Sequence, residues 1–560
     1  MKIICKIFFC ACLLITFSNL NAQIPAWQWA NNIYGQSSLG GSQDVIESVA
    51  TDPWGNVYVC GHTSGKILIL GNDILKFDSI KYGHWDGFLL KYNKDGKLIW
   101  SYSIIGEESD YCNDVATDAK GNVYLTGSFI SKKIVFGKTI LTCKSEHACM
   151  FLAKFDPDGN ILWAKQSDGK NKEEDDIGLA LTVDIFGNIY SLVTFYGSTI
   201  DLGAGEIKNT GKRDAIIVKY NSNGNVLWTK SFSSIEYDEF RDIVVDKKCN
   251  VYIVGASPAT KFGSTQIVNK GRSDIIIAKF NRDGHNLWVK NFGGQRDNFV
   301  PEIVVDLNEN FYISGYFDDY EFDLGSVKIY SSQWLSSHAY IAMFDSDGQV
   351  KWVRDFAAGG QTYNNAATSM SLDSKGNIFL SGSFQNSFLK LDSLTIAKSS
   401  DSGKNDLFII KFNANGEAKW AKTAKSTENI MPSKILVDAS DNILIAGNHT
   451  AELTSFDNII LLSPLDEYKM HNSFIAKIGN TNTFKGIEDF KIYPNPSNGI
   501  FNLKNISEET HISIYDCQGK HIFSNKGDNT QINIESVRSG MYVLKLLNEG
   551  RISYHKIIIQ

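Results

Sequence analysis

Acidic residues recur at a fixed offset ahead of a repeated Asp, and they are the side chains in this chain most suited to chemistry. Asp114, Asp242 and Glu302 each stand four residues before one copy of that Asp, where other copies carry Ser, Ala or Lys. Carboxylates arranged in a ring can bind a cation or a network of sugar hydroxyls. Aromatic residues near the same positions could stack on a ligand, and these are Tyr111, Tyr237 and Tyr363.

A second offset carries Asp or Asn more regularly. Eight residues before the repeated Asp stand Asp44, Asp110, Asp176, Asp238, Asn298 and Asn365. A polar residue repeated in this way is typical of a side chain that accepts hydrogen bonds from backbone N–H groups of its own loop. We interpret these residues as such acceptors. The position that carries Asp114, Asp242 and Glu302 varies in residue type among the copies. Two interpretations remain open for it, a ligand site and a solvated channel rim.

A repeated segment must position these side chains. It reads TDPWGNVYVCG at 51–61 and TDAKGNVYLTG at 117–127, and it recurs seven times. Its β-branched and aromatic residues predict two strands, and its Gly supplies the positive φ of a tight turn. We assign the repeated Asp, and the Asn four residues after it, a structural role in that turn. They are Asp52, Asp118, Asp184, Asp246, Asp306, Asp373 and Asp438, with Asn56, Asn122, Asn188, Asn250, Asn310, Asn377 and Asn442.

A second segment follows each copy and ends in Trp, as in DGFLLKYNKDGKLIW at 86–100. It predicts a second hairpin, so each copy has four strands, which is typical of a propeller blade. The seventh copy stops short of its Trp, whereas Trp29 stands near the N-terminus without a copy of its own. We therefore expect a seven-bladed β-propeller whose last blade is closed by an N-terminal strand. The tryptophans, expected to pack blade against blade, are Trp29, Trp100, Trp163, Trp228, Trp288, Trp352 and Trp420.

The two ends of the chain differ from the repeats. Residues 1–22 combine Lys2 and Lys6 with a short apolar run and close on a small residue, as a secretory signal peptide does. The propeller is expected at 23–479 and a polar linker at 480–486. Residues 487–560 alternate apolar residues with Gly turns, which predicts a small Ig-like β-sandwich. The expected fold is therefore all-β throughout.

Both parts resemble known families. The repeats resemble the SBBP-type bacterial β-propeller repeat, which implies a fold and no single activity. The C-terminal segment resembles the type A sorting domain of the type IX secretion (Por) system of Bacteroidota. That resemblance implies Sec export to the periplasm, recognition by the type IX secretion machinery, and delivery to the outer cell surface or the medium. The matching residues are Tyr493, Pro494, Asn495, Pro496, Gly499, Gly519, Gly540, Tyr542 and Lys556.

Composition and missing motifs narrow the function. A net charge of -7 with interspersed charges gives no nucleic-acid footprint, and no segment after the signal is long enough to span a membrane. We expect no catalytic residue, no metal site and no cofactor, because HExxH, CxxC and GxSxG motifs are missing. Calcium at the DxDG turns is the alternative, although no bidentate Glu follows them. Cys143 and Cys149 are close enough in sequence to pair locally.

The expected function is binding of a glycan, a surface polymer or a protein ligand by an exported propeller. The alternatives are a polysaccharide-active hydrolase with acidic residues at the channel mouth, and a non-catalytic surface scaffold. A hydrolase predicts that Asp114, Asp242 and Glu302 converge in a pocket. A binding module predicts an open face with exposed aromatic residues, and a scaffold predicts neither.

Overall fold

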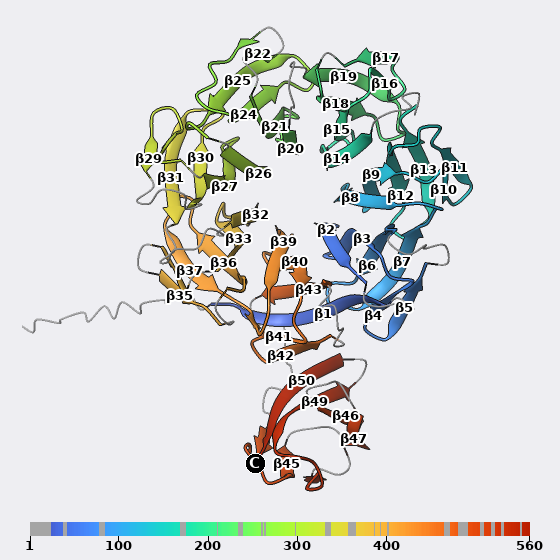
Figure 1. Ribbon diagram of the computed structural model, residues 1–560, viewed down its shortest axis with the longest axis vertical. Coiled ribbons are helices and arrows are strands. Elements are labelled where there is room, and N and C mark those ends of the chain that lie inside the picture. The colour runs from blue at the N-terminus through green and yellow to red at the C-terminus, as the bar shows by residue number, and fades with distance from the viewer. Residues whose placement is uncertain are drawn as a thin grey trace, which may run out of the picture.

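The computed structural model shows an all-β protein whose sheets surround a central axis (Figure 1). Among the residues that the structure describes there is no helix, so the all-β prediction is confirmed, and no helix could cross a membrane. The predicted signal peptide and the linker at 480–486 lie outside these residues. The described residues are 24–36, 42–77, 84–168, 175–209, 211–232, 239–258, 261–262, 265–296, 298–317, 319–330, 338–356, 366–385, 387–391, 394–399, 403–463, 471–479, 491–504, 509–516, 521–527, 531–548 and 551–560.

Six antiparallel sheets each take four strands from one stretch of the chain, with the first strand nearest the axis (Figure 1). Sheets 1 to 3 consist of β2 (Asp44–Thr51), β3 (Val57–Thr63), β6 (Asp86–Tyr92) and β7 (Leu98–Ile104); β8 (Asp110–Thr117), β9 (Val123–Phe129), β12 (Cys149–Phe155) and β13 (Ile161–Gln166); and β14 (Asp176–Val183), β15 (Ile189–Phe195), β18 (Asp214–Tyr220) and β19 (Val226–Phe232). Sheets 4 to 6 consist of β20 (Glu239–Val245), β21 (Val251–Ser257), β24 (Asp274–Phe280) and β25 (Asn286–Phe292); β26 (Asn298–Val305), β27 (Phe311–Phe317), β30 (His338–Phe344) and β31 (Val350–Phe356); and β32 (Ala366–Leu372), β33 (Ile378–Phe384), β36 (Asp406–Phe412) and β37 (Ala418–Lys422).

Sheet 7 combines both ends of the ring. Its strands are β39 (Ile430–Val437), β40 (Ile443–His449), β43 (Asn472–Gly479) and the N-terminal β1 (Ala26–Gln36). β1 pairs antiparallel with β43 and places Trp29 opposite Lys477, as Trp100 stands opposite Lys91 in sheet 1. The N-terminal strand therefore fills the fourth place of the last sheet, which is where the out-of-phase Trp29 predicts it.

Short outer hairpins, which the sequence did not predict, lie between the second and third strands of each copy. They are β4 (Ile67–Leu70) with β5 (Asp73–Lys76), β10 (Lys133–Phe136) with β11 (Thr139–Thr142), β16 (Thr199–Asp201) with β17 (Glu206–Lys208), β22 (Lys261–Phe262) with β23 (Thr265–Gln266), β28 (Glu321–Asp323) with β29 (Lys328–Tyr330), β34 (Phe388–Leu391) with β35 (Leu394–Ala397), and β41 (Leu453–Phe456) with β42 (Ile459–Leu462). The first of these hairpins pairs with the end of β1, and β38 (Lys425–Ser426) pairs with β41. Strands of two to four residues carry too little periodicity to be recognised in sequence.

The core lies between neighbouring sheets. The second and third strands are almost entirely buried, because side chains on both of their faces meet an adjacent sheet. One apolar cluster joins Cys60 and Leu89 of sheet 1 to Val123 and Phe151 of sheet 2. Burial on both faces explains why these strands read as continuous apolar runs in the sequence.

The C-terminal region forms two packed sheets. One contains β44 (Lys491–Tyr493), β45 (Ile500–Lys504) and β48 (Gln531–Asn533), and the other contains β46 (His511–Asp516), β47 (His521–Lys526), β49 (Gly540–Asn548) and β50 (Arg551–Ile559). Their shared core includes Phe501 and Ile532 from the first sheet and Ile514 and Leu544 from the second. Apolar residues of both sheets thus alternate inward, as in a β-sandwich.

Candidate functional site

The repeated Asp closes the turn between the first and second strands, at the end of the ring that we call the turn end. Asp52 Oδ1 accepts hydrogen bonds from the backbone N–H groups of Trp54 and Asn56, both at 3.0 Å. Its Oδ2 accepts from Asn56 Nδ2 at 2.7 Å and from the Tyr58 hydroxyl at 3.1 Å. The bond from the Asn N–H recurs at Asp118, Asp184, Asp246, Asp306, Asp373 and Asp438. These carboxylates are occupied by the turn.

The Trp of each fourth strand joins neighbouring sheets. Trp100 Nε1 of sheet 1 donates to the Pro157 carbonyl of sheet 2 at 3.2 Å. Trp29 Nε1 of sheet 7 donates in the same way to the Lys94 carbonyl of sheet 1, at 3.1 Å. The equivalent bond is made by Trp163, Trp228, Trp288 and Trp352. Trp29 therefore joins sheet 7 to sheet 1 by the same kind of hydrogen bond that joins each of sheets 1 to 5 to the next sheet. Trp420 differs, because it is buried in the core of sheets 6 and 7.

A β-bulge in the first strand of each sheet shapes the wall around the axis. In sheet 1, Ile46 pairs with Gly61 and Ser48 with Cys60, so Glu47 is the extra residue. Corresponding bulges interrupt the first strands of the other sheets. A bulge bends its strand and re-aims the side chains around it. The residue four before the repeated Asp comes directly after this bend.

Asp114 and Asp242 use that position to hold the first strand of the next sheet. Asp114 Oδ2 accepts from the Leu181 N–H of sheet 3 at 2.7 Å, and its Oδ1 accepts from the Ser48 hydroxyl of sheet 1 at 2.6 Å. Asp242 Oδ2 of sheet 4 accepts from the Ile303 N–H of sheet 5 at 2.9 Å. Both carboxylates therefore link neighbouring sheets at the axis.

Glu302 of sheet 5 and Lys434 of sheet 7 form an ion pair between sheets that are not adjacent. Lys434 Nζ donates to Glu302 Oε1, and Glu302 Oε2 accepts from the Met370 N–H of sheet 6. Glu302 is only 4% exposed, whereas the Lys434 side chain is 27% exposed. The pair thus joins sheets 5 and 7 through a buried carboxylate and a partly exposed lysine side chain.

The charges around Lys434 depend on one another. Burial alone would lower the pKa of Lys434, but the carboxylates of Glu302, Asp242 and Asp114 outweigh burial and raise it. Burial raises the pKa of Asp242 to about 7 and also raises that of Asp114, although Lys434 opposes both shifts. The side chains around the axis thus form a wall of mixed charge, in which the ammonium group of Lys434 interacts electrostatically with all three carboxylates.

Tyr111 lies near the opposite end of the ring, the loop end, where the first and third strands begin. The His62 ring is 4.9 Å from the Trp85 ring and 5.1 Å from the Tyr111 ring, and both contacts are edge-on. Glu47 Oε1 is 3.8 Å from His62 Nε2. Burial lowers the pKa of His62 to about 4 and raises that of Glu47 to about 6. His62 is therefore neutral at pH 7, and Tyr111 packs on its ring.

Asp44 and Asp110, eight residues before the repeated Asp, accept hydrogen bonds as predicted, whereas Asn298 at the same offset donates through Nδ2 to the Ser273 and Arg296 carbonyls. Asp44 Oδ2 accepts from the Gly35 N–H, and Asp110 Oδ2 accepts from the Ser131 hydroxyl at 2.9 Å. Burial raises the pKa of Asp44 to about 7 and that of Asp110 to about 8. Asp238 and Asn365, in contrast, lie outside the described residues, as do the candidates Tyr237 and Tyr363.

Sequence reasoning missed two groups of wall residues. It treated Lys434 only as an exception to the acidic offset, although the structure places this lysine among Asp114, Asp242 and Glu302. It also missed the bulge residues, including Glu47, because a bulge is defined by strand pairing and leaves no motif. Across the described parts of the chain, no three His, Cys, Asp or Glu side chains lie close enough to hold a metal ion.

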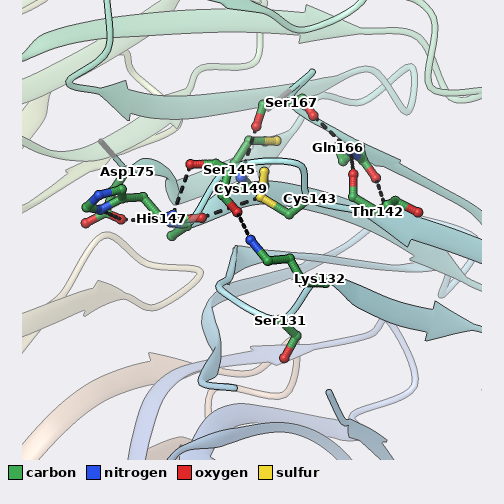
Figure 2. The surroundings of a disulfide bond; sticks show 12 residues. Ser131, Lys132, Thr142, Cys143, Ser145, His147, Cys149, Gln166, Ser167 and Asp175 are labelled. Carbon is green, nitrogen blue, oxygen red and sulfur yellow. Dashed lines mark hydrogen bonds and ion pairs between the residues drawn. A yellow bond between two sulfur atoms is a disulfide. The ribbon is translucent and has the colours of Figure 1, made fainter. Parts of the chain in front are cut away.

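A disulfide joins Cys143, after the outer hairpin of sheet 2, to Cys149, the first residue of β12 (Figure 2). Their Cα atoms are 5.8 Å apart. The loop between them is held by two further bonds, from Lys132 Nζ to the Ser145 carbonyl at 2.7 Å and from the His147 N–H to Ser145 Oγ at 3.0 Å. The local pairing that the spacing suggested is therefore formed.

The residues of the expected sorting signal fix the end of the chain. Asn495 Oδ1 accepts from the Ile558 N–H at 2.9 Å, which ties this segment to β50. Gly499 has φ of 101°, and a Cβ there would come within 2.6 Å of the Glu535 backbone, so only Gly fits. The Tyr542 hydroxyl donates to the Arg538 carbonyl at 2.7 Å. Gly540 pairs with Ile559 of β50, and Tyr493 pairs with Asn502 of β45. Gly519 and the side chain of Lys556 lie outside the described residues.

Two family models match the chain. Residues 491–560 match the secretion system C-terminal sorting domain, and residues 38–69 match the β-propeller repeat. The chain carries a sorting domain. This domain indicates export by type IX secretion, to the cell surface or out of the cell, in agreement with the sequence prediction.

Curated relatives are distant and much longer. The chain is 24% identical over 456 residues to an uncharacterized WD repeat-containing protein of Acanthamoeba polyphaga mimivirus, covering 66% of this chain and 32% of that protein. It is 25% identical over 220 residues to the regulatory protein FlaEY of Caulobacter vibrioides, covering 38% of this chain and 22% of that protein. The chain thus spans a third or less of the length of these relatives.

Solved structures with a similar arrangement include the β-propeller domain of the Trilobed protease from Pyrococcus furiosus, with 8% identity and a TM-score of 0.36 over 75% of this chain and 95% of that chain. They also include PorZ, a surface component of the type IX secretion system of Porphyromonas gingivalis, with 11% identity and a TM-score of 0.25 over 92% and 81%. At these TM-scores the likeness carries no argument about function.

Proposed function

We propose that sheets 1 to 7 are the blades of a closed seven-bladed propeller, that the sorting domain is an Ig-like sandwich, and that the propeller is an exported binding module. Its ligand is a glycan, a surface polymer or a protein that reaches the axis from the loop end. The observation that carries this proposal is the mixed-charge wall of Asp114, Asp242 and Lys434. These three side chains are partly exposed and come from three different sheets of an otherwise regular frame.

The hydrogen bonds favour binding over hydrolysis. A glycoside hydrolase needs one carboxyl group that donates a proton and another that attacks or activates water. Asp114 and Asp242 instead accept backbone N–H groups, and Glu302 accepts from Met370 and Lys434. We therefore propose no catalytic residue at this site. We also propose no cofactor and no calcium, because the carboxylate oxygens already serve protein donors.

A ligand screen tests the proposal. Purified protein spanning residues 23–560 is applied to a glycan array with and without calcium, beside an Asp114→Asn/Asp242→Asn variant. Asp95→Asn/Asp158→Asn is the matched control, since it removes the same charges from exposed turns at the turn end. Saturable binding that the axis variant loses and the control keeps supports the axis as the site. Equal loss in both variants would reject the axis, and silence across the array would leave a protein ligand or a scaffold role.

A further inference from the structure

The turn end of the ring exposes large apolar side chains at matching places in several sheets. The tips between the first and second strands carry Trp54 in sheet 1, Ile185 and Phe186 in sheet 3, and Leu307 in sheet 5. These side chains are 60%, 68%, 71% and 70% exposed, respectively. A single exposed apolar residue is ordinary, but several gathered on one face mark an interaction surface.

A second apolar set on the same end comes from a β-bulge at the start of the fourth strands. In sheet 1, Tyr92 pairs with Leu98 and Lys91 with Trp100, so Ile99 is the extra residue. The residue at this bulge is half exposed in four consecutive sheets. The exposed fractions are 52% for Ile99, 51% for Leu162, 52% for Leu227 and 51% for Leu287. Sheets 5 and 6 carry Lys351 and Lys419 at the same bulge, so the apolar arc has a defined end.

Lysines alternate with the apolar tips. The tips of sheets 2, 4 and 6 carry Lys120, Lys248 and Lys375, and all three are exposed. Two acidic residues of the neighbouring tips already have partners within the protein. Glu309 pairs with Lys248 at 2.6 Å, and Asp441 accepts hydrogen bonds from the tip of sheet 6. The inner tips therefore present apolar groups together with the exposed Lys120 and Lys375, whereas Lys248 is engaged by Glu309, in a protein whose net charge is -7.

The outer turns of the same end carry both signs of charge. Their acidic residues are Asp95, Asp156, Asp158, Asp283, Asp345, Asp347 and Glu417, of which Asp345 pairs with Lys351 and Glu417 with Lys419. The side chains of Lys165, Lys230 and Lys290 lie against the turn glycines of the next sheet. Lysines are thus distributed over the turn end among acidic residues, and at its inner tips Glu309 is in an ion pair and Asp441 accepts hydrogen bonds from Ser374.

We propose that this turn end docks on an anionic lipid surface. The aromatic and aliphatic tips would enter the boundary between headgroups and acyl chains, where Trp and Phe are favoured. The interleaved lysines would contact anionic headgroups, an attraction that opposes the overall negative charge of the chain and so orients the ring. Export to the cell surface brings the protein beside lipid. This surface lies at the turn end, whereas the ligand is proposed to reach the axis from the loop end. Neither proposal depends on the other.

Cosedimentation with vesicles tests the proposal on protein spanning residues 23–560. Binding is expected to phosphatidylcholine vesicles that contain about 30% phosphatidylglycerol and much less to phosphatidylcholine alone. Trp54→Ser/Phe186→Ser and Lys120→Glu/Lys375→Glu should each weaken binding at least about tenfold. The matched control is Tyr320→Ser/Tyr330→Ser, which removes aromatic groups that are 61% and 55% exposed at the outer hairpin of sheet 5. It should bind like the parent protein, and all variants should melt like it.

Four outcomes would overturn the proposal. They are no cosedimentation with either vesicle at low salt, equal binding to both vesicles, an equal loss in the tyrosine control, and binding that the lysine variant retains. Sedimentation equilibrium without vesicles covers one other occupant, a second copy of the chain. Dimers that the Trp54→Ser/Phe186→Ser variant cannot form, together with no vesicle binding, would assign the surface to that copy.

Discussion

The turn end and the loop end of the ring are built from the same strands but are held in different ways. At the turn end every sheet repeats one solution, in which an Asp accepts the N–H of the Asn four residues later. At the loop end the first residue of the third strand changes from sheet to sheet. It is Asp86, Cys149, Asp214, Asp274, His338, Asp406 and Asn472 in sheets 1 to 7.

The loop after each outer hairpin shows what this variation does. In sheet 2 it is tied by the disulfide of Cys149. In sheet 6 Asp406 Oδ2 accepts from the Ser399 hydroxyl at 2.8 Å, and in sheet 4 Asp274 Oδ2 accepts from the Lys270 N–H at 2.9 Å. One backbone position thus holds its loop by a covalent bond in one sheet and by hydrogen bonds in others. The turn end fixes the frame, and the loop end can vary without disturbing it.

The largest effect is expected where the frame closes on itself, at Trp29. Trp29→Ala should lower the free energy of unfolding by about 3–5 kcal/mol, because it removes a buried indole and the bond to the Lys94 carbonyl. Urea unfolding measures this loss. Trp54→Ala is the control at the same end, since Trp54 is exposed, and should change stability by less than about 0.5 kcal/mol. A loss at Trp29 no larger than the control would show that this junction does not hold the frame.

The next effect concerns the repeated turn itself. Asp118→Ala leaves two backbone N–H groups, the Asn122 amide and the Tyr124 hydroxyl without their acceptor, so stability should fall by about 2–3 kcal/mol. Asp156 accepts from two N–H groups and the Asn160 amide in the same pattern, but in an exposed turn. Asp156→Ala should therefore cost less than about 1 kcal/mol. Equal losses in thermal unfolding would mean that burial does not distinguish the two turns.

A smaller effect is expected at the loop end, from the disulfide. Cys143→Ser/Cys149→Ser should lower stability by about 2 kcal/mol, because the bond closes a short loop in the unfolded chain. Dithiothreitol should lower the melting temperature of the parent protein and leave that of the double variant unchanged. Asp406→Ala, at the same position of sheet 6, should destabilise equally with and without reductant. A parent protein insensitive to dithiothreitol would contradict the covalent tie.

Much of the frame could be predicted from the sequence because it repeats. The Asp and Asn of each turn recur at one spacing, and Trp29 was recognised as a fourth-strand Trp because its copy is missing at the other end. The separation of Cys143 and Cys149 allowed a local disulfide without predicting that it forms. These features depend on local spacing, which a sequence shows directly.

The site around the axis could not be predicted in the same way. The bulge at Glu47 exists only through pairing between two strands. Lys434 pairs with Glu302, which is 132 residues away in the sequence, and also interacts electrostatically with Asp242 and Asp114. Its role therefore depends on how three distant sheets face one axis. Such contacts follow from closure of the ring, and no local pattern encodes them.

The smallest effect compares the two ends through pH. Burial raises the pKa of Asp44 and Asp176 at the loop end to about 7 and that of Asp110 to about 8. The folded protein therefore keeps protons that the unfolded chain releases near pH 4, at about the ordinary pKa of Asp. Stability from these groups is complete below about pH 4 and is lost as the pH rises through about 7 to 8. The free energy of unfolding should thus fall between pH 5 and pH 9.

Asp438 at the turn end makes a contribution to stability that depends on pH in the opposite direction. Burial would raise its pKa, but hydrogen bonds from Lys477 and Asn442 outweigh burial and lower it, so its stability is present above the ordinary pKa and lost in acid. Asp110→Asn should make the fall between pH 5 and pH 9 smaller, because it removes one of the three carboxyl groups whose pKa is raised. Asp438→Asn should lower stability without changing that slope. Urea unfolding at both pH values decides the comparison, and a free energy that rises with pH would refute the loop-end assignment.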